Sequence, residues 1–218
     1  MNEKTQDYTP ALGFKFLTGL YDSLIRMFMP ENSMRRLIGD VILPREGEHI
    51  LEFGFGTGSN IISLLRRWPN TQLTGIDIDA KVRDIAARKI EKQGLGAKLD
   101  LYEGGTLPYD DGQFDAAFTL LVLHHLTSEA KTKALAEFYR VIKPGGRLIV
   151  GDFARPANIF LRIAFLLVQI VDGFKTTDDN LKDRLPGMIK GAKFVDLVER
   201  TSLNTLTGTI RYYCARRP

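Results

Sequence analysis

The chain has 218 residues, of which 44% are hydrophobic and 26% charged, and its formal net charge is +4. This composition is that of a globular protein, and the length favours a single domain over residues 1–218. The basic residues are scattered rather than gathered into a stripe, so we expect no nucleic acid as a partner. The only cysteine, Cys214, excludes an internal disulfide and a cysteine metal cluster, as is typical of a cytoplasmic protein.

Two amphipathic helices are predicted in the first 45 residues. Residues 11–29 place their polar side chains on one helical stripe and leave an unusually wide apolar face, and Pro30 ends the pattern. Residues 33–43 show a second helical period, which Pro44 stops. We expect residues 1–45 to form an N-terminal helical cap on the main fold.

The next stretch joins a strand to a helix through three glycines. An apolar run ends in Glu52, after which Gly54, Gly56 and Gly58 alternate with other residues. Glycines at every second position weaken a packed strand, but they suit a backbone that turns sharply and lets a ligand come close. The helix that follows presents free N–H groups and a partial positive charge at its start. The pattern predicts a loop that binds a nucleotide-like ligand.

Strand and helix patterns alternate after this loop, and the chain then ends in two consecutive strands. Further strands are expected at residues 72–78, 99–102, 114–121 and 147–153, and the final pair at 195–206 and 209–216. The alternation predicts an open α/β sheet with right-handed crossovers, and the tight turn at Thr207-Gly208 predicts a hairpin. The expected fold is a Rossmann-like, doubly wound, seven-stranded and mostly parallel sheet with a C-terminal antiparallel hairpin.

Residues 157–171 form the most apolar segment of the chain. This segment is too short to span a bilayer comfortably, and it contains a charged residue, Arg162. We expect a core or lid helix here. A helix that lies on a membrane surface is the alternative, and it would make the protein peripheral to the membrane.

Asp77 ends the second strand, nineteen residues beyond Gly58. In a doubly wound sheet this position lies beside the glycine loop, where one carboxylate accepts hydrogen bonds from both hydroxyls of a ribose. Capping the next helix is the alternative role for this residue. The neighbouring Asp79 fits that role better.

His124 and His125 follow the strand at residues 114–121, at the carboxyl edge where α/β sheets place their ligands. Only one of two adjacent side chains is expected to point into the site, and we choose His124 as the candidate general base. A structural histidine bonded to a loop carbonyl is the alternative. No pair among the three histidines has the spacing of a zinc-binding helix motif, so we expect no metal site.

Several segments, taken in order, resemble one known family. They are Glu52 to Gly58, Asp77, Leu107-Pro108-Tyr109 before Phe114-Asp115, Leu123 to Leu126 and Lys143 to Leu148. Together they resemble the class I S-adenosylmethionine-dependent methyltransferases, and most nearly the ubiquinone/menaquinone-biosynthesis C-methyltransferase-like group. The resemblance extends from about Tyr21 to the end of the chain. It implies transfer of a methyl group to a small molecule by in-line displacement at the sulfonium of S-adenosylmethionine.

The resemblance also implies roles for individual residues. Glu52 stands where the family usually has aspartate, near the ammonium of the cofactor's methionine part, and residues 154–192 form a helical insertion that covers the substrate. The further cofactor contacts that it implies are Tyr21, Gly54, Gly56 and Gly58 around the methionine and ribose, Asp77 at the ribose hydroxyls, Ile78, Glu103 and Gly104 at the adenine, and Thr119 at the sulfur end.

The acceptor is expected to be apolar, such as a quinone precursor or a lipid, because the apolar side chains of residues 11–29 and 157–171 could together line its pocket. A monomer and a homodimer are both compatible with the sequence.

Two other functions stay open. A non-catalytic S-adenosylmethionine-binding protein is compatible with the departure at Glu52. An NAD(P)-dependent oxidoreductase is disfavoured, because Ser59 stands where its G-x-G-x-x-G fingerprint has the third glycine.

Overall fold

The computed structural model describes residues 30–218, apart from the side chains of residues 167 and 171. The helix predicted over residues 11–29, and Tyr21 within it, lie outside the described residues. The second predicted helix is present as α2 (Glu31–Ile42). It buries Met34, Ile38 and Ile42 against the sheet, as its helical period requires.

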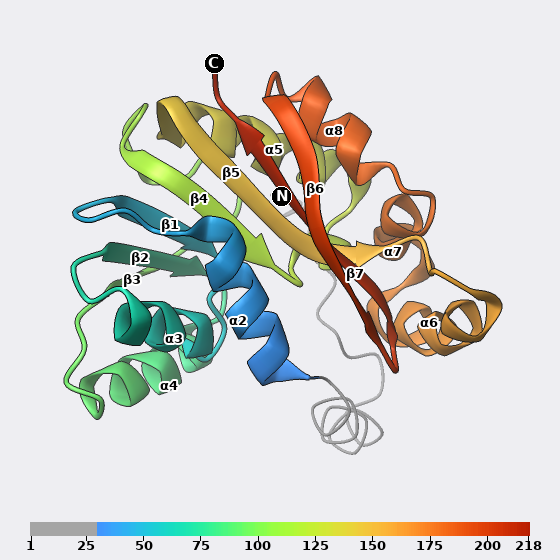
Figure 1. The fold of residues 1–218 in the computed structure, drawn as a ribbon, viewed down its shortest axis with the longest axis horizontal. Coiled ribbons are helices and arrows are strands. Elements are labelled where there is room, and N and C mark those ends of the chain that lie inside the picture. Colours follow the sequence, from blue (N-terminus) through green and yellow to red (C-terminus); the bar gives the residue numbers. More distant parts are fainter. Residues whose placement is uncertain (1–29) are drawn as a thin grey trace, which may run out of the picture.

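One seven-stranded sheet organises the chain, in the order β3-β2-β1-β4-β5-β7-β6 (Figure 1). Its first five strands are parallel: β1 (His49–Phe53), β2 (Gln72–Asp77), β3 (Lys98–Leu101), β4 (Phe114–Leu120) and β5 (Ile142–Ala154). The last two form the antiparallel hairpin, β6 (Val195–Thr205) and β7 (Gly208–Arg216). The predicted fold class is therefore confirmed. The strand order reverses between β1 and β4, and in open α/β sheets the carboxyl ends at such a switch point border the ligand crevice.

Helices cover both faces of the sheet. On one face lie α2, α3 (Ser59–Arg67) and α4 (Ala80–Glu91), and on the other lie α5 (Ser128–Val141) and α8 (Leu185–Gly191) (Figure 1). Each face has its own hydrophobic cluster. Ile61 and Leu64 belong to the first cluster, and Leu135 and Phe138 belong to the second. A sheet that is covered on both faces explains why the central strand β4 is almost wholly apolar.

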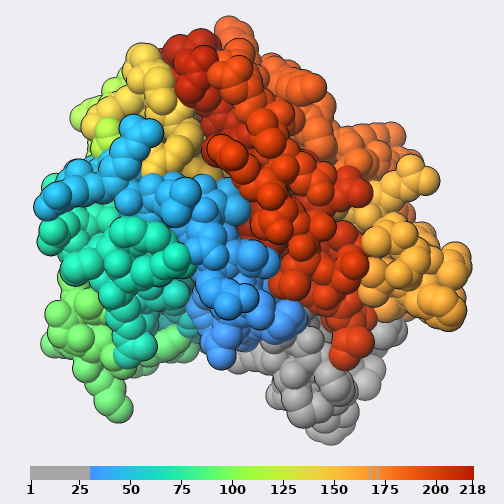
Figure 2. Space-filling model, in the orientation of Figure 1, coloured from blue at the N-terminus to red at the C-terminus, as the bar shows by residue number. Residues whose placement is uncertain are grey.

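The C-terminal part of the sheet carries two further helices, α6 (Ile159–Asp172) and α7 (Phe174–Leu181), beyond the carboxyl end of β5 (Figure 1). Asn158 caps α6 by accepting a 2.9 Å hydrogen bond from the Leu161 amide. Phe165 and Val168 are buried, but much of the helix is exposed on the rim of the molecule, orange in Figure 2. This position suits a lid rather than a core helix. None of the helices between residues 30 and 218 is both long and apolar enough to cross a membrane.

The segment at Lys143-Pro144-Gly145-Gly146 differs from the expectation of a loop between helix and strand. Strand β5 already begins at Ile142, which pairs with Phe114, and the regular register resumes with Arg147 opposite Ala116. The residues between form a bulge. The Gly145 amide donates to the carbonyl of Arg217 at 2.9 Å, so the last residues of the chain hold this segment in the sheet.

Candidate functional site

The three glycines after β1 adopt positive φ angles of 77°, 51° and 72° at Gly54, Gly56 and Gly58. At two of these positions, neighbouring side chains leave no room for a Cβ atom. A Cβ at Gly54 would lie 2.4 Å from Val122, and one at Gly58 would lie 3.0 Å from Ala86 on α4. A Cβ at Gly56 would meet no described residue within 4 Å. Of the three, only Gly56 faces space that residues 30–218 leave open, which is the place for a ligand.

Asp77 holds the glycine loop from the end of β2. Its Oδ2 accepts a 2.8 Å hydrogen bond from the Gly56 amide, and its Oδ1 accepts a 3.1 Å bond from the Asp79 amide. A carboxylate offers about four lone-pair positions, so acceptor capacity remains for ribose hydroxyls. The capping role belongs to Asp79, which accepts from the Lys81 amide at 2.7 Å at the start of α4.

Glu52 is fully buried near the carboxyl end of β1. Its Oε1 accepts a 2.8 Å hydrogen bond from the side-chain amide of Asn60, but its Oε2 has no hydrogen-bond partner in the described part of the structure. Burial, with a contribution from the charge of Asp77, raises the pKa of Glu52 to about 8, although Asn60 opposes the shift. A buried carboxylate oxygen without a partner requires a cation or a proton, so the site suits an ammonium group.

The remaining residues that sequence reasoning assigned to the cofactor lie at the same edge of the sheet. Ile78 and Glu103 are exposed just beyond β2 and β3, whose ends are joined by a 2.8 Å bond from the Tyr102 amide to the Asp77 carbonyl. Gly104 follows with a φ of 94°. Thr119 is fully buried beside Phe53 in the β1–β4 ladder, and its Oγ1 has no hydrogen-bond partner among the described residues.

His124 lies in the short 3-10 helix η1 (Leu123–His125) directly after β4. Its Nδ1 is 2.7 Å from Oδ1 of Asp152, a fully buried residue of β5 that also accepts from the amides of His124 and Phe153. Burial lowers the pKa of His124, but the charge and hydrogen bond of Asp152 outweigh burial and raise it. The partner is therefore a carboxylate and not the loop carbonyl of the alternative expectation.

Sequence reasoning missed Asp152. The available signal was an acidic residue inside the otherwise apolar run from Leu148 to Phe153, at the carboxyl end of a parallel strand. An isolated carboxylate in such a run is costly to bury unless it is paired, which makes it a candidate for a site.

Comparison with known proteins agrees with this geometry. Residues 50–146 match the protein family described as "Methyltransferase domain". The demethylmenaquinone methyltransferase of Thermus thermophilus is 34% identical over 145 residues, which are 66% of this chain and 65% of that protein. The chain is similar to the class I S-adenosylmethionine-dependent methyltransferases.

Two more proteins extend the similarity over most of the chain. The ubiquinone/menaquinone biosynthesis C-methyltransferase UbiE of Pseudoalteromonas translucida is 28% identical, over 76% of this chain and 72% of that protein. A solved S-adenosylmethionine-dependent methyltransferase from Aquifex aeolicus has the same fold, with a TM-score of 0.65 and 17% identity, covering 89% of this chain and 97% of its own. This chain spans about two thirds of the length of the T. thermophilus relative.

Beside the glycine loop, the structure places a second group of polar residues where η1 meets the end of α6. The Oδ2 of Asp172 lies 3.6 Å from Nε2 of His124, and its Oδ1 lies 3.6 Å from Nδ1 of His125. Burial and the neighbouring His124 lower the pKa of His125 to about 3. Both histidines therefore border the same space, whereas the sequence led us to expect only one of them there.

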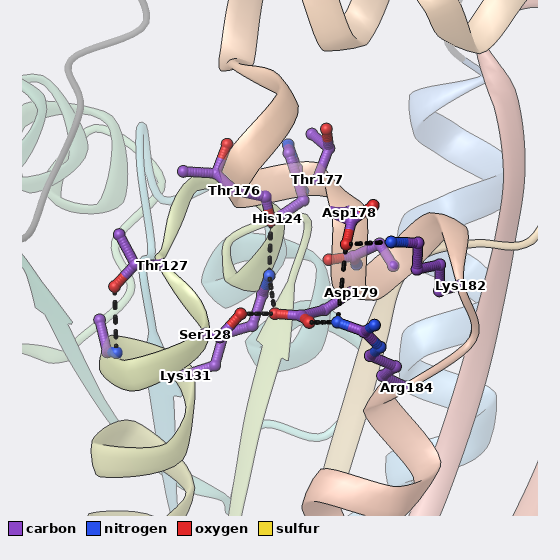
Figure 3. Close-up of polar contacts among 12 residues, drawn as sticks. His124, Thr127, Ser128, Lys131, Thr176, Thr177, Asp178, Asp179, Lys182 and Arg184 are labelled. Atoms are coloured by element: carbon purple, nitrogen blue, oxygen red, sulfur yellow. Dashed lines mark hydrogen bonds and ion pairs between the residues drawn. The ribbon is translucent and has the colours of Figure 1, made fainter.

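The Asp178-Asp179-Asn180 segment of the covering region has a structural role. Asp179 is buried. Its carboxylate accepts hydrogen bonds from Ser128 Oγ at 2.5 Å, Lys131 Nζ at 3.3 Å and Arg184 Nη1 at 3.3 Å, as Figure 3 shows. Lys131 is itself fully buried and donates to the carbonyl of Thr176. These contacts fix α7 against α5. Helix α6 therefore connects β5 to a helix that is held in place.

Substitution of Lys131 by methionine is expected to lower the free energy of unfolding by about 2–4 kcal/mol, because it leaves the buried Asp179 carboxylate with only the half-exposed Arg184 as a cation. Urea unfolding measures the change. The double substitution Lys131→Met/Asp179→Leu should recover much of the loss, since it removes both charges. A loss below about 1 kcal/mol in the single variant would contradict the assignment.

Proposed function

We propose that this protein transfers the methyl group of S-adenosylmethionine to a small apolar acceptor. The observation that carries the proposal is the buried Oε2 of Glu52, which has no hydrogen-bond partner among the described residues and lies within electrostatic reach of Asp77. The methionine part of the cofactor brings an ammonium for the carboxylate of Glu52, and its ribose brings two hydroxyls for Asp77. When bound, the cofactor supplies a methyl group that its sulfonium has already activated.

The other cofactor contacts are proposed from the family resemblance and from their positions. Ile78, Glu103 and Gly104 stand at the adenine end of the site, beyond β2 and β3. Thr119 is assigned to the sulfur end, and its unpartnered Oγ1 suits that role. Tyr21 keeps the contact that the family resemblance implies.

On the acceptor side the main task of the protein is positioning. Holding the nucleophile in line with the methyl and the sulfur supplies roughly 7–11 kcal/mol of the barrier reduction. We assign His124 as the catalytic side chain, because Asp152 fixes its ring through Nδ1 and leaves Nε2 directed toward the end of α6. From there it activates the acceptor's nucleophilic group, and the insertion at residues 154–192 covers the acceptor.

The acceptor is assigned as a quinone precursor or a related lipid-like molecule. The relatives in T. thermophilus and P. translucida are named for menaquinone or ubiquinone biosynthesis, which supports a quinone-like acceptor. The exposed apolar side chains of α6, which include Ile159, Phe160 and Ile163, support contact with an apolar molecule or a membrane surface. We accordingly place the protein in the cytoplasm, in part at the membrane surface.

Binding of S-adenosylhomocysteine, measured by calorimetric titration, tests the cofactor half of the proposal. Asp77→Ala is expected to weaken binding roughly 10- to 100-fold, because two charge-assisted hydrogen bonds are lost. Asp77→Asn is a second variant, since its side-chain oxygen still accepts from the Gly56 amide. Asp79→Ala is the matched control: it removes a helix cap and should leave affinity within a factor of a few.

Three outcomes would count against the proposal. Unchanged affinity of Asp77→Ala for S-adenosylhomocysteine would mean that Asp77 does not bind the ribose. Tight binding of NADH without binding of S-adenosylhomocysteine would favour the oxidoreductase. Cofactor binding without methylation of any quinone, lipid or polar acceptor would favour a non-catalytic binding protein.

A further inference from the structure

We infer that His124, His125 and Asp172 form a binding site for one divalent transition-metal ion. The three residues come from two elements, η1 and the C-terminal end of α6, and their ligand atoms all lie within 4.8 Å of one another. The site itself follows from these side chains. Only its role toward the acceptor rests on the proposed function.

The distances favour a shared ion over direct ion pairs. The separations from Asp172 to His124 and to His125 are both 3.6 Å, longer than the 2.7–3.2 Å of an N–H···O hydrogen bond. An ion held tetrahedrally at about 2.0–2.2 Å from each ligand separates neighbouring ligand atoms by about 3.3–3.6 Å. The two histidine–carboxylate separations, one to each oxygen of Asp172, are close to the edge length of such a coordination polyhedron.

The three ligand atoms indicate which metals the site would bind. Two imidazole nitrogens and one carboxylate oxygen suit Zn²⁺, Fe²⁺, Co²⁺ or Ni²⁺, whereas Mg²⁺ and Ca²⁺ prefer oxygen ligands alone. Three protein ligands also leave a coordination position open, as in catalytic rather than structural zinc sites. That position is available to an oxygen of a second molecule.

The surroundings of His124 provide a second, independent observation. Its Nδ1 is bonded to the Asp152 carboxylate at 2.7 Å, so the ring presents Nε2 to the ion. A metal-binding histidine commonly donates its other ring N–H to a carboxylate, which orients the ring and increases its basicity. Asp152 in turn accepts hydrogen bonds from the amides of His124 and Phe153, so the carboxylate that orients the His124 ring is itself held in place.

The position of the site suits an acceptor that carries an oxygen. Val122, two residues before His124, lies directly against Gly54 of the cofactor loop. The ion would therefore lie at the same sheet edge as the methyl donor, between that loop and the covering helix α6. A phenolic or enolic hydroxyl bound to the open position would lose its proton more readily than it does in water. With the ion in place, His124 would activate the acceptor through the metal and would not take the proton itself.

Titration of the full chain with Zn²⁺, after removal of any histidine tag, tests the proposal. We expect one equivalent to bind saturably, and Co²⁺ to give the visible absorption of a low-symmetry nitrogen and oxygen site. His125→Ala and Asp172→Asn should each weaken Zn²⁺ binding at least 10-fold, and Asp152→Asn roughly 10- to 100-fold. His49→Ala is the matched control, since His49 bonds Thr74 at the opposite end of β1.

Binding of S-adenosylhomocysteine by each variant shows that it is folded and separates the two proposals. No saturable binding of Zn²⁺ or Co²⁺ at millimolar metal, in protein that binds S-adenosylhomocysteine, would overturn the metal site alone. Metal binding that survives His125→Ala and Asp172→Asn but is lost in His49→Ala would also overturn it. Metal binding that these variants abolish, in a protein that never binds S-adenosylhomocysteine, would leave the site standing and remove the proposed function.

Discussion

Substitution of Glu52 by glutamine is expected to stabilise the ligand-free protein at pH 8 while weakening its binding of S-adenosylhomocysteine. The two effects have opposite signs because Glu52 is costly to bury when it is charged and useful only when a cation arrives. Its Oε2 has no partner among the described residues. A glutamine keeps an oxygen for Asn60 but removes the charge.

The pH dependence of this effect follows from the pKa of Glu52, which burial and Asp77 raise from 4.5 to about 8 in the folded protein. Between these values the unfolded chain has lost the proton and the folded chain retains it. The unfolded state then binds fewer protons, so stability falls as pH rises through this window. The limiting slope is about 1.4 kcal/mol per pH unit, and the whole loss is of the order of 3–5 kcal/mol.

Urea unfolding of both proteins from pH 5 to pH 9 measures the effect. The wild type should lose stability up to about pH 8, and Glu52→Gln should not show this contribution. Glu91→Gln, which changes an exposed carboxylate on α4, serves as the control and should keep the wild-type slope. Equal slopes in all three proteins would mean that Glu52 does not retain its proton.

Affinity for S-adenosylhomocysteine supplies the second half of the test. Loss of a charge-assisted contact with the ammonium should weaken binding by roughly 10- to 100-fold in Glu52→Gln. In the wild type, binding near pH 7 should release close to one proton, because the ammonium favours the ionised carboxylate. Calorimetry in buffers of different ionisation enthalpy detects that proton.

Methyl transfer is expected to fall by roughly 10²- to 10⁴-fold in His124→Ala, while affinity for S-adenosylhomocysteine stays within a factor of a few. The reason is spatial: His124 lies after β4 on the proposed acceptor side, whereas the proposed cofactor contacts other than Thr119 come from β1, β2, β3 and the loops after them. The measurement uses radiolabelled S-adenosylmethionine with a lipid extract that contains quinone precursors. His49→Ala should retain wild-type turnover.

Two results would contradict this prediction. If His124→Ala lost cofactor affinity and turnover in the same proportion, the residue would be structural. If the lipid extract gave no methylated product while a soluble polar metabolite did, the assignment of an apolar acceptor would be wrong.

The sheet, the glycine loop and the final hairpin could all be predicted from residue patterns. These features are local: periodicity of apolar residues separates strand from helix, and glycines mark where φ must be positive. Asp77 and Asp79 lie two residues apart, and their different roles follow from their positions at the strand end and the helix start. For the same reason the helix α6 was predicted correctly.

The meeting of distant segments could not be predicted in this way, and the structure shows it. It placed β7 between β5 and β6, brought Asp152 to His124 and Asp172 to both histidines, and buried Lys131 against Asp179. It also put α6 at the rim, with apolar side chains outward. Periodicity specifies which side of an element is apolar, but it carries no information on which strands become neighbours or which buried charges they bring together.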